Sequence, residues 1–297
     1  MNRNLSYNYL IQPIPASLNQ GFSVNITYNN FQCPLPTWCD ERPIGDGACT
    51  PCNNNCPTST IFTSPTNNVN NDCCTAESAC SIDTAFSKVN WMSNAESLVL
   101  LPGVYEITSN LQVSVPGITI EAQDSINRPI LRATSSFHKS ILTLNSTRTT
   151  LIGIIFEENI SQNGALYVNA TVTNTQVMIY NCAFRGNVVD CSLSDCTGAV
   201  YVDSHTKSAL ITILNSEFLD NSITTSQLIG IGGAAVHLKQ NSNLVIISCS
   251  FINNRVEALS SSSGSLALNS SGGAIYVSDP GFVTIINSTF HNNVVSS

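Results

Sequence analysis

The sequence predicts an all-β protein in which short parallel strands stack as a β-helix, or solenoid. Two observations predict this fold. The motif Phe-x-x-Asn occurs five times between residues 156 and 293, and a Gly-Ala strand such as Gly273-Ala274-Ile275-Tyr276-Val277 follows each of the first four copies. A single unit of this kind cannot bury its own apolar face, so successive units must stack around a common core.

Residues 1–32 form the first of three expected segments. They contain two short β-like runs, at 7–14 and 22–28, which are separated by a stretch rich in turn-forming residues. The sequence therefore predicts a short β-like N-terminal segment.

Residues 33–80 form a cysteine-rich segment with little apolar periodicity. Such a composition cannot build a hydrophobic core, so covalent cross-links must supply the order. Cys49-x-x-Cys52 with Cys56 also has the spacing of zinc ligands, but no second well-spaced Cys pair or histidine follows. We therefore expect disulfides, with the pairing left open, among Cys33, Cys39, Cys49, Cys52, Cys56, Cys73, Cys74 and Cys80.

Residues 81–297 are the expected β-helix, which begins with a cap helix at about 81–93. Apolar residues from Ile82 to Met92 recur with the 3.6-residue period of an amphipathic helix, and Ser81 can cap its start. Short strands separated only by turns follow from Leu98. The helix would cover the first open sheet edge, which would otherwise invite aggregation.

The turn Leu100-Leu101-Pro102-Gly103-Val104-Tyr105 resembles the Leu-x-Pro-Gly-x-Tyr turn that follows the cap helix in the pectin-lyase-like class. This resemblance covers roughly Ser81 to the end of the chain and implies a right-handed parallel β-helix. The repeats themselves resemble the GGAI and FxxN repeats of chlamydial polymorphic outer membrane proteins and related adhesin-like β-helices. This chain departs from that pattern at Asn163 and Thr197, which stand where the first Gly would be, and by an extra residue in the third strand.

Stacking places equivalent residues of successive coils about 4.8 Å apart. The repeated Phe would then form an interior aromatic column, and the repeated Asn an amide ladder. We expect these residues to form the fold rather than to take part in catalysis. The members of this structural ladder are Phe156, Phe184, Phe218, Phe251, Phe290, Asn159, Asn187, Asn221, Asn254 and Asn293.

The length differences between repeats fall in one arc of the coil. The arc from Asn to the next strand Ala grows from 6 residues (159 to 165) to 12 (187 to 199), 14 (221 to 235) and 20 (254 to 274). Stacked in register, these insertions lie on one side of the solenoid, formed by 188–197, 222–232 and 255–271. This side is the expected binding surface.

The distance between coils also predicts whether the remaining cysteines can form disulfides. Cys182 and Cys249 lie at equivalent positions two coils apart. They would be roughly 9.6 Å from each other, beyond the reach of a disulfide, so we expect both to be free. Cys191 and Cys196 lie in one loop and are the expected pair within the solenoid.

Composition points to an extracellular or cell-surface protein, although no N-terminal signal is visible. The net charge of −8 argues against nucleic acid or an anionic membrane as partner. No apolar run approaches the roughly 20 residues of a membrane span. Besides the cysteines, seven sequons mark N-glycosylation candidates, at Asn4, Asn25, Asn145, Asn159, Asn169, Asn269 and Asn287.

Catalytic motifs are not recognised in this sequence, and no catalytic residue, cofactor or metal site is expected. The best charged cluster is Glu217 and Asp220, with Arg185 one coil earlier, and a surface ion pair explains it. A possible glycan-binding row consists of the outward rings of Tyr167, Tyr201, His237 and Tyr276.

These features favour a noncatalytic extracellular or cell-surface β-helix, adhesin-like or structural, that binds a cell-surface protein or glycan through lateral loops. The alternatives are a polysaccharide-active enzyme, lyase or hydrolase, and a carbohydrate-binding module of pectin-lyase-like fold. The chain stops where a further loop would begin, so we expect a stack that is open at its C-terminus, and that continues or is capped by a partner.

Overall fold

The computed structural model of this 297-residue chain describes residues 3–4, 24–25, 59–66, 73–92, 95–134, 139–190, 197–204, 207–225, 232–258, 272–277 and 281–296. The chain divides into two compact units, Met1–Thr58 and Ser59–Ser297. In the first unit, strands β1 (Arg3–Asn4) and β2 (Val24–Asn25) pair in parallel. The disulfide candidates Cys33, Cys39, Cys49, Cys52 and Cys56 lie outside the described residues.

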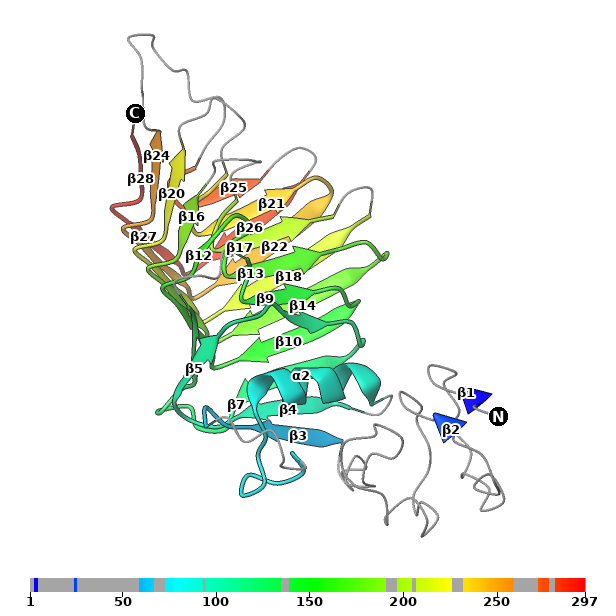
Figure 1. Cartoon of the computed structure of the whole chain (residues 1–297). Helices are drawn as coiled ribbons and strands as arrows, with labels where there is room; N and C mark the ends of the chain where they lie inside the picture. Colours follow the sequence, from blue (N-terminus) through cyan, green and yellow to red (C-terminus); the bar gives the residue numbers. More distant parts are fainter. Residues whose placement is uncertain are drawn as a thin grey trace. The chain divides into compact units, whose positions relative to one another are not determined.

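The second unit is a parallel β-helix, which confirms the predicted fold class (Figure 1). The chain passes through four sheets in turn, numbered 1 to 4 here in chain order, and every described strand pair in them is parallel. Figure 1 shows the strands of each sheet lying side by side, from β3 and β4 beside the helix to β26, β27 and β28.

Sheets 1 and 2 form two long sides of the coil. Sheet 1 consists of β3 (Thr60–Thr63), β4 (Ser97–Leu100), β7 (Ile118–Ala122), β10 (Arg148–Ile152), β14 (Thr175–Tyr180), β18 (Ala209–Leu214), β22 (Ser242–Ile247) and β26 (Phe282–Ile286). Sheet 2 consists of β5 (Val104–Ile107), β8 (Ile130–Ala133), β11 (Ile155–Glu157), β15 (Ala183–Arg185), β19 (Glu217–Leu219), β23 (Ser250–Ile252) and β27 (Thr289–His291).

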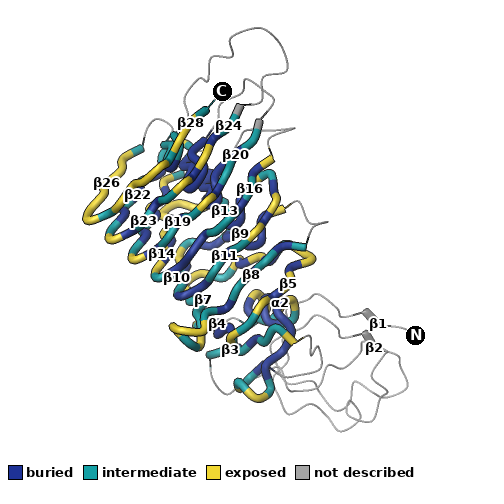
Figure 2. Tube along the Cα trace, turned by 90° about the vertical axis from the view of Figure 1, so that its left-hand side faces the viewer, coloured by how far each residue is buried: buried dark blue, intermediate teal, exposed yellow. Residues whose placement is uncertain are grey.

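Sheet 4 completes each coil, and sheet 3 contributes a strand only from residue 160 onward. Sheet 3 consists of β12 (Ile160–Ser161), β16 (Val188–Asp190), β20 (Ser222–Thr225), β24 (Arg255–Ala258) and β28 (Val294–Ser296). Sheet 4 consists of β6 (Leu111–Val113), β9 (Leu142–Leu144), β13 (Leu166–Asn169), β17 (Val200–Asp203), β21 (Val236–Lys239) and β25 (Ile275–Val277). Figure 2 shows buried residues along the inside of these coils and exposed ones along their outer turns.

Helix α2 (Ile82–Trp91) covers the first coils and contacts β3 and β6. The Ser81 side chain caps it by accepting a hydrogen bond from the Thr84 backbone N–H at 3.4 Å. Its buried face includes Phe86 and Val89, as the helical periodicity predicts. The polar face turned away from the stack ends the apolar core without leaving a bare sheet edge.

The first strand of the stack lies further upstream than the expected boundary at residue 81. β3 pairs with β4 in sheet 1, and Ile61 is fully buried in the common core. The disulfide between Cys73 and Cys80 lies against this strand, because Phe62 N–H donates to the Cys73 carbonyl at 2.8 Å and Cys80 N–H donates to the Phe62 carbonyl at 3.2 Å. Cys74 is also disulfide-bonded. The end of the cysteine-rich segment is therefore part of the β-helix unit.

An aromatic column fills the middle of the coils. Adjacent strands of sheet 2 align Phe156, Phe184, Phe218, Phe251 and Phe290. Their ring centroids are 4.7 to 4.9 Å apart and the rings are nearly parallel. The first four are fully buried. Stacked rings at this spacing add a favourable aromatic contact to the burial of each ring.

An asparagine ladder runs beside the aromatic column, at the bend between sheets 2 and 3. Asn187 donates through Nδ2 to Asn221 Oδ1 at 2.9 Å, and Asn221 and Asn254 donate in the same way to the next Asn of the ladder, at 2.9 and 2.8 Å. Each of these Nδ2 atoms also donates to a Phe carbonyl of the preceding coil. The first member, Asn159, differs because its Nδ2 donates to the Gly164 carbonyl.

A column of glycines precedes sheet 4, where neighbouring coils approach most closely. A Cβ atom at Gly164 would lie 2.0 Å from the Gly198 carbonyl oxygen, and one at Gly198 would lie 2.3 Å from the Gly233 carbonyl oxygen. Gly233 in turn forms a parallel bridge with Gly272. Backbone packed this closely excludes every side chain, which is why the repeat keeps Gly here.

Candidate functional site

The lateral side of the solenoid, where the insertions accumulate, is built on sheet 3. Each insertion begins with a strand of that sheet, so that Val188, Ser222 and Arg255 lie at equivalent positions of β16, β20 and β24. Most of the remaining insertion residues, 191–196, 226–231 and 259–271, lie outside the described residues. The expected loop face therefore starts from an ordered sheet rather than from irregular loops.

A small apolar cluster anchors sheet 3. Val189, Ile223 and Val256 alternate inward along their strands and bury against Ala234, apart from the main core. The neighbouring positions face outward, and Arg255 pairs there with Glu257 at 3.0 Å. Sequence reasoning missed these strands, although the alternation in Val188-Val189-Asp190 is the signal that marks one.

The predicted aromatic row lies on sheet 4. Tyr167, Tyr201, His237 and Tyr276 occupy one register position, with successive ring centroids 5.1 to 5.3 Å apart. Tyr201 and His237 are only 5% and 4% exposed, whereas Tyr167 and Tyr276 are half-buried. Two of the four rings of the possible glycan-binding row are therefore buried, and the two end members are partly exposed.

Polar groups two residues further along the same strands border the row. The Tyr201 hydroxyl donates to Asp203 Oδ2 at 3.3 Å, and Asn169 Nδ2 donates to Asn145 Oδ1 at 3.0 Å. Burial, and then the Asp203 charge, raise the pKa of Tyr167. Tyr167 thus stays a neutral hydroxyl through the physiological range, next to amide groups. Partly exposed rings beside amides and a carboxylate suit a polar ligand without negative charge, such as a neutral sugar.

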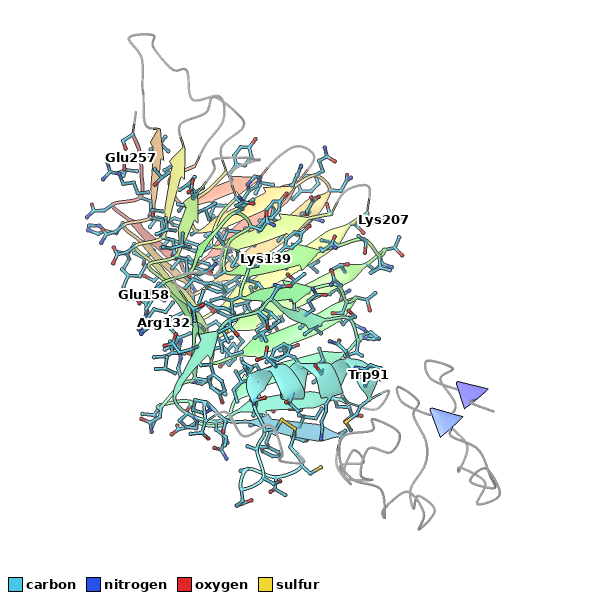
Figure 3. All side chains as sticks on the ribbon, in the orientation of Figure 1. Trp91, Arg132, Lys139, Glu158, Lys207 and Glu257 are labelled. Carbon is cyan, nitrogen blue, oxygen red and sulfur yellow. A yellow bond between two sulfur atoms is a disulfide. The ribbon has the colours of Figure 1, made fainter. Side chains whose placement is uncertain are left out.

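A row of charged side chains lies on the outer face of sheet 2. Glu106, Arg132, Glu157 and Arg185 alternate in sign at one register position of adjacent strands. Arg132 donates to Glu157 at 2.6 Å and lies 3.3 Å from Glu158, and Figure 3 shows Arg132 and Glu158 beside each other.

The cluster expected around Arg185 follows the same pattern. Arg185 pairs with Glu217 at 3.1 Å, while Asp220 accepts a hydrogen bond from Asn253 Nδ2 at 3.0 Å. Both members of the ion pair are about one third exposed, so the pair is a surface contact of small energetic weight. The arginines and glutamates of sheet 2 therefore pair with one another across neighbouring strands. This pairing gives the cluster around Arg185 a structural explanation.

Comparisons with known proteins add little to this geometry. No family model and no curated protein matches the chain. Among solved structures, the chain is similar to the pectate lyase Pel9A, with 14% identity over 77% of this chain and 78% of that one, and a TM-score of 0.34. The assignment of the fold therefore rests on the strand pairing described above.

The two solenoid cysteines that the structure describes are structural in character. Cys182 and Cys249 are free and buried, as the repeat spacing predicts. Burial raises the pKa of the Cys182 thiol to about 11, and it also raises the pKa of Cys249. Neither thiol is ionised near neutral pH, so neither has the nucleophilic thiolate that redox or catalytic cysteines need. The candidates Cys191 and Cys196 lie outside the described residues.

The candidate N-glycosylation sites differ in how far their asparagine side chains are buried. Asn159 is fully buried, with its amide nitrogen bonded to the Gly164 carbonyl, so the folded chain has no room for a glycan there and this prediction is wrong. Asn145 and Asn169 are half-buried and bonded to each other, whereas Asn287 is exposed at a turn. Asn4 and Asn25 lie in β1 and β2, and Asn269 lies outside the described residues.

The described residues were also compared with the requirements of a metal site and of a membrane-spanning helix. Within the described ranges, no three His, Cys, Asp or Glu side chains are grouped so as to hold a metal ion. No helix among those same residues is both long enough and apolar enough to cross a membrane.

Proposed function

We propose that this protein is a noncatalytic extracellular or cell-surface β-helix, adhesin-like or structural, that binds a partner through the lateral side built on sheet 3. The observation that carries this proposal is the placement of the insertions. Along the chain, all three lengthened segments lie between a strand of sheet 3 and the next strand of sheet 4, while the strands of sheets 1 and 2 keep nearly constant lengths. Variable loops on a rigid scaffold are where repeat proteins bind their partners.

Two further features support the extracellular part of the proposal. The disulfide between Cys73 and Cys80, together with a bonded Cys74, suits an oxidising compartment. The resemblance of the Phe-x-x-Asn and Gly-Ala repeats to those of polymorphic outer membrane proteins and adhesin-like β-helices favours a role at a cell surface.

Replacing residues 259–271 with a short Gly-Ser turn tests the lateral loops. This change keeps β24 and Gly272, so sheet 3 and its apolar anchor stay intact. Attachment of protein-coated beads to cultured cells should fall at least ~10-fold, because the variant loses most of the longest insertion. Val172→Ser, in an exposed turn between sheets 4 and 1, is the control and should attach like wild type. Equal attachment by the loop variant and wild type would count against the lateral side.

A second candidate function is the binding of a neutral glycan at the ends of the aromatic row. The partial exposure of Tyr167 and Tyr276 favours it, since sugar rings stack on exposed aromatic faces. Binding to a glycan array should fall at least ~10-fold for Tyr167→Ala and for Tyr276→Ala. Tyr180→Ala removes an exposed ring from sheet 1 and serves as the matched control. An array that gives no signal with the wild-type protein would remove this candidate.

A further inference from the structure

The coil formed by β25, β26, β27 and β28 presents one side to solvent. Each of these strands is the last in its sheet, and Figure 1 shows them at the other end of the stack from helix α2. Inward-facing residues that earlier coils bury are open here. Phe290 and Ile285 are 43% and 47% exposed, whereas their equivalents in the preceding coil, Phe251 and Ile246, are fully buried. This side is therefore one half of a coil-to-coil interface.

A cavity of about 600 Å³ lies on this side of the coil. Every described residue that lines it is apolar or an asparagine, and Ile285, Phe290 and Asn293 are among them. The strands beside it also present backbone N–H and C=O groups along their open edges, which parallel pairing would satisfy. An apolar cavity bordered by strand edges suits an extended polypeptide rather than a charged ligand or a small apolar one.

The asparagine ladder specifies one side chain of that polypeptide. From Asn187 onward, the backbone N–H and Nδ2 of each ladder Asn both donate to Oδ1 of the next, as Asn221 does to Asn254 at 3.3 and 2.9 Å. Asn254 donates in the same way to Asn293, at 3.0 and 2.8 Å. Asn293 has no such acceptor among the described residues, and its Nδ2 donates to the Phe251 carbonyl. Its backbone N–H and second amide hydrogen therefore converge on the position of one more Asn Oδ1.

The aromatic column specifies a second side chain, three residues before that Asn. Phe290 stacks on Phe251 with ring centroids 4.7 Å apart and ring planes 2° from parallel. No described ring covers its other face, so a further ring placed there at the same spacing would gain both burial and stacking. Together, the ring and the amide select a segment with the pattern Phe-x-x-Asn.

We propose that this side of the last described coil binds, in trans, an extended Phe-x-x-Asn segment of a second polypeptide, which pairs in parallel with β26 and β27 as a further rung. Continuity with the established interface selects this occupant, because a stacked ring, a shared amide and parallel backbone pairing join each earlier coil to the next. A folded second copy of this chain does not qualify, since it buries its own Phe156, Phe184, Phe218 and Phe251.

A peptide with the sequence of residues 281–293 is the probe. Fluorescence polarisation of the labelled peptide with the full chain should show saturable binding with a dissociation constant of about 1 to 100 μM, since ordering the peptide costs affinity. In the peptide, Phe290→Ala removes the ring, and Asn293→Leu keeps the size of the side chain but removes the acceptor. Each change should raise the constant at least ~10-fold.

Two adjacent isoleucines of β26 provide matched variants of the protein. Ile285 faces the cavity and Ile286 faces outward, with similar exposed fractions of 47% and 44%. Ile285→Glu should raise the dissociation constant at least ~10-fold, because the peptide would have to desolvate the charge, whereas Ile286→Glu should change it less than about twofold. Circular dichroism checks that both variants fold, and the two altered peptides decide the matter if Ile285→Glu does not.

Three results would overturn the proposal. The first is a wild-type chain that does not bind the peptide up to about 500 μM. The second is an equal loss of binding for the two isoleucine variants, which would place the peptide on the outer face of sheet 1. The third is equal binding of the Asn293→Leu peptide, which would mean that the cavity takes any apolar segment and that the ladder does not select its occupant.

Discussion

Asn221→Ala should lower the free energy of unfolding by about 3 to 6 kcal/mol, since each orphaned buried polar group costs about 1 to 3 kcal/mol. The Asn221 amide donates to Asn254 Oδ1 and to the Phe184 carbonyl, and it accepts from the side chain and the backbone N–H of Asn187. Alanine removes all four contacts, so the Asn187 backbone N–H and the Phe184 carbonyl lose their Asn221 partner, while Asn254 Oδ1 keeps the Asn221 backbone N–H. Denaturant unfolding followed by circular dichroism measures the change.

Gln176→Ala is the control for the ladder variant. Gln176 is an exposed amide on the outer face of β14, so its removal should change stability by less than about 0.5 kcal/mol. A loss below 1 kcal/mol for Asn221→Ala would mean that water replaces the ladder, and that the amides do not hold the coils together.

Gly198→Ala should be at least as damaging, with a loss of about 3 to 5 kcal/mol or failure to accumulate as soluble protein, because overpacking here is against backbone. The added Cβ would lie 2.3 Å from the Gly233 carbonyl oxygen and 3.1 Å from the Ala235 carbonyl. No rotamer change can relieve this contact, so two coils would have to separate where sheet 4 begins. Thermal unfolding and soluble yield report the effect.

Gly117→Ala separates this steric effect from backbone strain. Gly117 has a φ of +80°, yet nothing lies within 4 Å of an added Cβ. It should therefore cost only the roughly 1 to 2 kcal/mol of a left-handed non-glycine residue. If Gly117→Ala proves as costly as Gly198→Ala, close approach of the coils is not the reason for the glycine column.

The repeat allowed much of the register to be predicted. Alignment of His237 with Tyr201 and Tyr276, in a strand with an extra residue, follows from the two-residue period of side chains. The free state of Cys182 and Cys249 follows from counting coils. The alignment of His237 and the free state of the two cysteines both depend on the number of residues between repeats, which can be read from the sequence.

The candidate site was less predictable because it depends on what covers each residue. Tyr201 and Tyr276 have the same place in the repeat, yet Tyr201 is buried and Tyr276 is half-buried. Asn159 carries a glycosylation motif, but its side chain is enclosed by the bend that begins the ladder. Neither outcome is encoded in local spacing, since burial is decided by segments distant in sequence.

By itself, the sequence determined the stacking of this protein. Its repeated Phe, Asn and Gly specify one column each, because each residue packs against or hydrogen-bonds to its equivalent in the neighbouring coil. Only the tertiary structure decided which outer faces are charged, apolar or covered. β3 joined sheet 1 through Ile61, although its segment is dominated by cysteines. The charged row of sheet 2 likewise emerged only when residues from separate coils were brought side by side. Such surfaces arise from the sum of several strands, and no single repeat contains them.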